Sequence, residues 1–146
     1  MLKAFAWRKE YKPENLRLKD LKHADKMVIF PHGVDKEGFP VQYIILKNDT
    51  IANDEEGIQE KQKLLVYNYE ITLPIMKEPE IYQVTTVVEL EGGSLSLGIV
   101  KALKGIFDEL GEYYPERSRR VIVLNAGWTL NIIWSFIKVN EKTNYF

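Results

Sequence analysis

Strand-like and helix-like segments alternate along this chain, and that order restricts the possible fold more than any other feature of the sequence. Short runs rich in β-branched residues predict strands over 27–30, 41–46, 84–90 and 120–125. The segments around them predict helices over 2–11, 53–78, 94–113 and 128–138. Strands joined by crossover helices form parallel pairs, so the expected fold class is α/β, a mostly parallel sheet flanked by helices.

Local signals set some of these boundaries. Pro13 should stop the first helix near Lys12, because the residue before a proline is pushed out of the helical region. The acidic run 54–56 suits the positive end of the helix that follows it, and Pro74 should bend or end that helix.

Size and composition favour one folded domain over residues 1–146, with 45% hydrophobic and 28% charged residues. A net charge of −1 argues against a nucleic-acid partner that is bound through many phosphate contacts. The chain has no cysteine, which excludes a disulfide scaffold, a thiolate metal site and a cysteine nucleophile. The apolar patch at the N-terminus is too short for the core of a signal peptide.

Positive charge is concentrated at the start of the chain, where residues 1–27 hold eight Lys and Arg against four acidic residues. Such a segment could lie against an anionic membrane surface. The alternative, which we prefer, is the solvated face of a helix.

No segment predicts catalysis or a cofactor. The glycine-containing run 91–98 lacks the Lys-Ser/Thr pair of a phosphate loop, and a strand-to-helix turn capped by Ser94 explains it better. His23 and His32 have no partner at ligand spacing, so no metal site is expected. Glu89 ends a strand, where α/β proteins often bind ligands, but alone it is a weak indication.

The uncharged segment 121–137 reaches the lower length limit of a membrane-spanning helix. Asn125, Gly127 and Asn131 interrupt it, however, and a strand and turn followed by the helix 128–138 is the preferred interpretation. That helix is apolar nearly all round, which requires a second apolar neighbour besides the protein core. A lipid, a membrane surface or a partner protein would serve.

Several motifs occur in the order known from one family. They are WRKEY at 7–11, DKEGFPV at 35–41, VTTVVELEG at 84–92, YYPER at 113–117 and VLNA at 123–126. Over essentially the whole chain the sequence resembles the CRAL-TRIO lipid-binding domain of the Sec-fourteen-like phosphatidylinositol/phosphatidylcholine transfer proteins.

The resemblance implies an apolar lipid groove with the sheet as its floor and the helix 128–138 as a gate. It places Tyr69 and Thr86 where the family contacts phosphatidylcholine, and Glu116 and Thr143 where it contacts a headgroup. Gln42 stands at a groove position that is tyrosine in the transfer proteins. The full set of lipid-binding residues expected is Gln42, Tyr69, Thr86, Glu116, Trp128, Ile133, Trp134, Ile137 and Thr143.

The chain also departs from the family pattern. Phe39 replaces the arginine of the family's Asp-Lys-x-Gly-Arg-Pro turn, and Gly127 replaces a proline. Relative to the family, the sequence is expected to be incomplete at both ends, lacking the N-terminal helical lobe and the strands after the gate. An incomplete domain would expose a sheet edge and the gate helix.

Two functions follow from these observations. The first is non-catalytic binding or exchange of a hydrophobic ligand, foremost a phospholipid, by a protein that is cytoplasmic or peripheral to a membrane. The second is a truncated domain that serves as a structural subunit, with partner subunits covering the gate helix and sheet edge in an assembly such as an organelle membrane complex.

Overall fold

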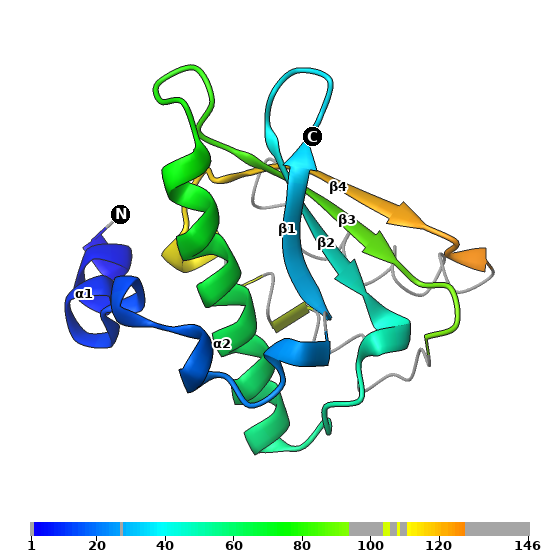
Figure 1. The fold of residues 1–146 in the computed structure, drawn as a ribbon. Coiled ribbons are helices and arrows are strands. Elements are labelled where there is room, and N and C mark those ends of the chain that lie inside the picture. The colour runs from blue at the N-terminus through cyan, green and yellow to red at the C-terminus, as the bar shows by residue number, and fades with distance from the viewer. Residues whose placement is uncertain (1, 27, 94–103, 106–107, 109–110, 128–146) are drawn as a thin grey trace.

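A four-stranded sheet forms the centre of the computed structural model, and a long helix lies across one of its faces (Figure 1). The structure describes residues 2–26, 28–93, 104–105, 108 and 111–127. The elements are α1 (Leu2–Tyr11), β1 (Ile29–Val34), β2 (Pro40–Ile45), α2 (Glu55–Thr72), β3 (Val84–Glu89) and β4 (Ser118–Leu124). Short 3₁₀ helices join them, among them Leu46–Asn48 and Leu73–Ile75.

The strands lie in the order β1-β2-β3-β4, and the sheet is mostly parallel as expected. β2 and β3 run parallel, as do β3 and β4, whereas β1 and β2 form an antiparallel hairpin. Gly38 lies in the hairpin turn with a φ of 90°, a backbone conformation that favours glycine. The α/β fold class is therefore confirmed.

Several of the expected elements have different bounds, and β4 begins two residues before the run 120–125. The helix expected over 53–78 is shorter, because the Asp54 side chain accepts a hydrogen bond from the Gly57 backbone N–H (2.8 Å) and caps α2. Its other end is at Thr72, where the chain passes into the 3₁₀ turn that contains Pro74. The first strand also begins and ends later than the run 27–30 predicted.

The expected helices over 94–113 and 128–138 lie largely or wholly outside the described residues. In the described part of the chain, no helix combines the length and apolarity that a membrane span requires.

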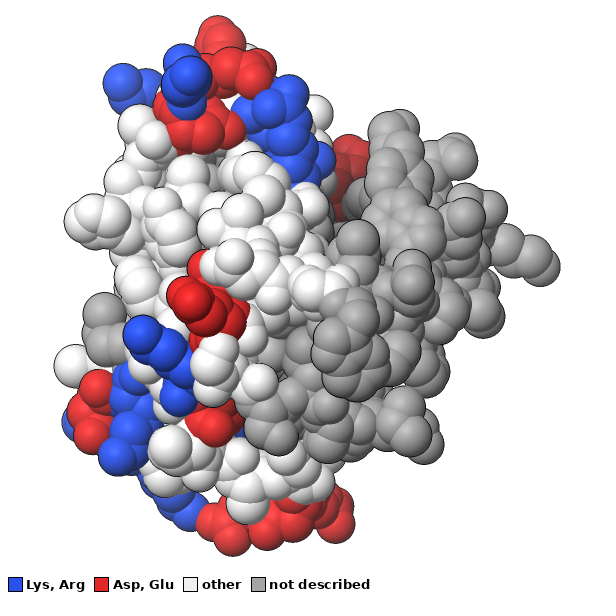
Figure 2. Space-filling model, turned by 90° about the vertical axis from the view of Figure 1, so that its right-hand side faces the viewer, with Lys and Arg blue, Asp and Glu red and all other residues white. Residues whose placement is uncertain are grey.

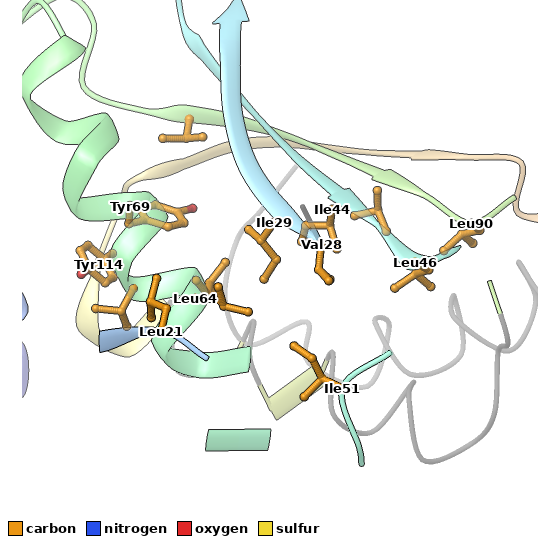
Figure 3. Close-up of a cluster of buried hydrophobic side chains, with 14 of the residues drawn as sticks. Leu21, Val28, Ile29, Ile44, Leu46, Ile51, Leu64, Tyr69, Leu90 and Tyr114 are labelled. Atoms are coloured by element: carbon orange, nitrogen blue, oxygen red, sulfur yellow. The ribbon is translucent and has the colours of Figure 1, made fainter. Parts of the chain in front are cut away.

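The core lies between the sheet and α2 (Figure 3). Ile44 on β2 and Val84 and Val88 on β3 belong to the same buried cluster as Leu64 and Tyr69 on α2. Each is at most 4% exposed, and burying one such side chain contributes roughly 1.5–3 kcal/mol. The sheet face that bears Ile44, Val84 and Val88 is therefore the one that packs against α2.

A buried ion pair holds the loop before α2 against the helix. The Lys61 ammonium lies 2.7 Å from an Asp49 carboxylate oxygen and donates to the Asn53 side-chain oxygen at 2.8 Å. The two charged side chains are only 6% and 7% exposed. Glu60, on the same helix turn, accepts from the backbone N–H groups of Lys22 and His23 and so ties the N-terminal segment to α2.

Candidate functional site

Two expected site residues, Gln42 and Thr86, are direct neighbours in the middle of the sheet. They are register partners on the parallel strands β2 and β3, so their side chains lie on the same face. Ile44 and Val88, two residues further along each strand, are the next pair on that face and belong to the core beneath α2. Gln42 and Thr86 are therefore polar positions within an otherwise apolar face, 0% and 3% exposed.

The side-chain amide of Gln42 is fully buried and unsatisfied. Neither its nitrogen nor its oxygen has a hydrogen-bond partner within the described part of the chain. Leaving a buried donor or acceptor unpaired costs about 1–3 kcal/mol, and almost all such groups in folded proteins have a partner. Among the described residues, this amide is the buried side-chain group that lacks a hydrogen-bond partner.

Tyr69 lies on the same side of the sheet, on α2, and is 2% exposed. Its ring centroid is 4.9 Å from that of Tyr114. Figure 3 shows the two tyrosines next to each other at the α2 end of the core. The structure therefore places three of the expected residues, Gln42, Tyr69 and Thr86, within the buried layer between sheet and helix.

An ion-pair network that the sequence analysis did not anticipate surrounds these tyrosines. Arg8 on α1 donates to both carboxylate oxygens of Glu70 at 2.9 Å, and the Tyr114 hydroxyl donates to the same carboxylate at 2.6 Å. Burial of the phenol, followed by its hydrogen bond to Glu70, raises the pKa of Tyr114 far above its usual range. Tyr114 is therefore a neutral hydrogen-bond donor that joins α1, α2 and the segment before β4.

Glu116, the expected headgroup residue, is not brought to Gln42 and Thr86. It is exposed, has a φ of 62°, and lies before β4, where its carbonyl accepts from the Gln83 side chain at 3.1 Å. Thr86 pairs with Val121 within β4, whereas Glu116 lies two residues before β4 begins at Ser118. A headgroup role for Glu116 would therefore need a second contact region, separate from the buried pair Gln42 and Thr86.

The remaining expected site residues lie outside the described residues. These are Trp128, Ile133, Trp134, Ile137 and Thr143.

On the opposite face of the sheet, Asp35 and Arg119 join the β1–β2 turn to β4. Arg119 donates to Asp35 at 2.6 Å and also bonds Glu37, and its guanidinium lies 3.8 Å from the centre of the Phe39 ring. Asp35 also accepts from the Thr85 hydroxyl at 3.0 Å. The family pattern has an arginine at the position of Phe39. Here the guanidinium at this turn comes instead from Arg119 on β4, which lies over the Phe39 ring.

The ionisation of Asp35 follows from these contacts. Burial raises its pKa, but hydrogen bonds from the Phe39 and Glu37 backbone and the Thr85 hydroxyl, together with the charge of Arg119, outweigh that effect. The net pKa of Asp35 is below its usual value, so this carboxylate is charged at neutral pH and serves the structure of the turn.

Glu89 has no property of a tuned catalytic acid. Its carboxylate accepts from the Glu91 backbone N–H at 2.7 Å and from the Asn125 amide at 2.9 Å, and these bonds lower its pKa. Glu89 thus joins the carboxyl ends of β3 and β4. The described residues contain no group of three His, Cys, Asp or Glu side chains that could hold a metal ion.

Apolar side chains are partly accessible along β4 and on the sheet face that bears Asp35. Phe30 stacks on Tyr43 with ring centroids 5.6 Å apart, while Ile122 and Leu124 are 43% and 42% exposed. Figure 2 shows one side of the molecule, where charged residues lie at the top, at the bottom and in a small group between them, and where uncharged residues form most of the other described surface. The described part of the chain therefore leaves apolar surface for a further neighbour to cover.

The comparisons with known proteins agree with the motifs. Residues 24–145 match the model of the CRAL/TRIO domain. The chain is 28% identical to the phosphatidylinositol/phosphatidylcholine transfer protein SFH12 and 27% identical to SFH11, both from Arabidopsis thaliana, over 90% of its own length. It spans only 27% and 40% of the length of these two relatives.

Among solved structures, the fold is similar to the crystal structure of Sfh5, with a TM-score of 0.63 at 16% identity. The match covers 93% of this chain and 53% of Sfh5, and it supports the arrangement of sheet and helices described above. With the family model matching most of its residues, the chain belongs to the CRAL/TRIO domain family.

Proposed function

We propose that this chain binds or exchanges a hydrophobic ligand without catalysing a reaction, and that the first candidate ligand is a phospholipid. Membership of the CRAL/TRIO family and the function named for two relatives, phosphatidylinositol/phosphatidylcholine transfer, support this proposal. The observation that carries it is the buried polar pair Gln42 and Thr86 on an apolar sheet face.

In this proposal the apolar layer shelters the acyl chains. Each buried methylene contributes about 0.8 kcal/mol, so a two-tailed lipid needs a long apolar lining before it leaves a membrane. The helix proposed over 128–138 would supply the remaining lining through Trp128, Ile133, Trp134 and Ile137. Thr86 and Tyr69 would contact the polar end of the ligand, and Glu116 and Thr143 would contact a headgroup that reaches the surface.

A transfer assay between vesicles tests this function. We expect the chain to move phosphatidylcholine or phosphatidylinositol from donor to acceptor vesicles, and Thr86→Val to slow transfer about tenfold by removing a buried hydroxyl. Glu116→Ala should reduce the transfer of phosphatidylinositol specifically.

Two variants serve as matched controls. Thr85→Val removes a hydroxyl from the opposite face, where it bonds Asp35, and should leave transfer per folded molecule unchanged. Glu80→Ala removes an exposed carboxylate elsewhere on the surface. Transfer that survives both Thr86→Val and Glu116→Ala would contradict these residue assignments, and the absence of any transfer would count against lipid exchange.

A second candidate function is that of a structural subunit in a larger assembly. In that case the chain would have the family fold but would not exchange lipid. The observation that favours it is β4, where Val121, Ile122 and Leu124 are each more than 40% exposed. A neighbouring protein that covered β4 would remove this apolar surface from water. In that case the chain would elute only within a complex and would carry no lipid.

A further inference from the structure

The hydrogen-bonding groups of the unpaired Gln42 amide restrict which chemical group of a ligand could bind there. It presents one donor group and one acceptor atom into a site that is 0% exposed, and both are without a partner in the described part of the chain. A single uncharged hydroxyl group can accept from the amide nitrogen and donate to an amide oxygen. An ester carbonyl or a phosphate oxygen can only accept, and a quaternary ammonium can do neither.

Two buried polar side chains on α2, Asn68 and Thr72, have partners within the protein. Asn68 donates to the Ile29 and Leu64 carbonyls at 2.9 and 2.7 Å, and Thr72 donates to the Asn68 carbonyl at 2.6 Å. The buried polar side chains of α2 are thus satisfied, whereas both polar atoms of the Gln42 amide on β2 are not. This contrast argues that its partner comes from outside the polypeptide.

Charge also restricts what can be bound there. Among the described residues, Lys61 is the one buried cation, and it is paired with the buried Asp49 carboxylate, while the buried Glu60 accepts from backbone N–H groups. A phosphate placed beside Gln42 would find no free buried cation in that part of the chain. Burying an unpaired charge is far more costly than burying a hydroxyl.

We propose that Gln42 is a specificity-determining residue that selects a lipid bearing an uncharged hydroxyl group and disfavours phosphatidylcholine. The inference rests on the proposed lipid-binding function and adds the chemistry of the group seated at Gln42. That hydroxyl can belong to a neutral lipid, such as a diacylglycerol, or to the inositol ring of phosphatidylinositol, and Thr86 lies beside it on the neighbouring strand.

Lipid competition in the unaltered chain provides the first test. The purified chain is incubated with vesicles that contain equal amounts of 1,2-dioleoylglycerol, its 3-acetyl ester, phosphatidylinositol and phosphatidylcholine, and native mass spectrometry identifies the bound lipid. The acetyl ester differs from dioleoylglycerol only by its capped hydroxyl. We expect at least one hydroxyl-bearing lipid to be held about tenfold more than the acetyl ester and phosphatidylcholine. Retention of dioleoylglycerol would identify a neutral lipid as the source of the hydroxyl, and retention of phosphatidylinositol would identify the inositol ring.

Gln42→Met provides the second test, because methionine keeps the length of the side chain and removes its amide. We expect this variant to lose the hydroxyl preference and, without lipid, to melt at the same temperature as the unaltered chain or higher. Gln83→Met is the matched control. The Gln83 amide donates to the Glu116 carbonyl at 3.1 Å, so its loss should lower the melting temperature and leave the lipid preference intact.

The possible failures are separable. If phosphatidylcholine or the acetyl ester is held as well as the hydroxyl lipids, or if Gln42→Met retains the preference, the role of Gln42 is refuted while lipid binding stands. A buried water as the partner of the amide would give that result. If no lipid is retained at all, the proposed function fails together with this inference.

Discussion

Replacing Lys61 by methionine should lower the free energy of unfolding by about 3–5 kcal/mol, among the largest losses for any single change in the described chain. The Lys61 ammonium is 2.7 Å from Asp49, and both side chains are more than 90% buried. Methionine would fill much of the volume but leave the Asp49 carboxylate without its counter-charge. The cost arises from this isolated buried charge rather than from the attraction that is lost.

Urea denaturation followed by circular dichroism measures the effect. Lys63→Met, two residues along α2 on a half-buried side chain, should change the free energy by less than about 0.5 kcal/mol. Adding Asp49→Asn to Lys61→Met should recover part of the lost unfolding free energy, because the asparagine amide is uncharged and leaves no unpaired buried charge. Equal costs for Lys61→Met and Lys63→Met would show that the pair is not buried as described.

Glu70→Ala should cost about 2–3 kcal/mol of unfolding free energy and loosen α1. The Glu70 carboxylate accepts two hydrogen bonds from Arg8 and one from Tyr114, so its removal leaves a buried phenol without an acceptor. The Arg8 contribution is smaller, because that side chain is 35% exposed and can bond water instead.

Two readouts separate the global from the local effect of Glu70→Ala. Denaturation gives the loss of stability, and limited trypsin digestion after Lys9, within α1, reports how firmly this helix is docked. Tyr114→Phe removes one of the three bonds and should cost about 1 kcal/mol, with little change in cleavage. If Glu70→Ala left both stability and cleavage unchanged, the network would not be what holds α1 to α2.

Local sequence patterns predicted the central strands well. The β-branched runs gave β2 and β3 to within one residue, because β-branched side chains suit a sheet buried on both faces. The end of α2 was less well predicted, since the periodic apolar residues continue to Ile75 although the helix ends at Thr72. The family resemblance, confirmed by the CRAL/TRIO match, depended on motifs rather than on periodicity.

The contacts around the candidate site could not be derived from local pattern. Arg119 reaches Asp35 across 84 residues, and Arg8 reaches Glu70 across 62. Nothing near these positions in the sequence signals the pairing, which arises only when the sheet and helices assemble. The sequence did single out Phe39 and Gln42 as departures from the family. Phe39 lies under the Arg119 guanidinium, and Gln42 holds the buried amide that has no hydrogen-bond partner.

The most direct test of lipid binding is the native mass of the purified full chain after incubation with phospholipid-containing vesicles. Our account predicts a mass increase equal to one lipid molecule for each polypeptide, and release of that lipid when the protein is unfolded. A bare polypeptide mass at every vesicle concentration, from a chain that remains folded, would contradict it.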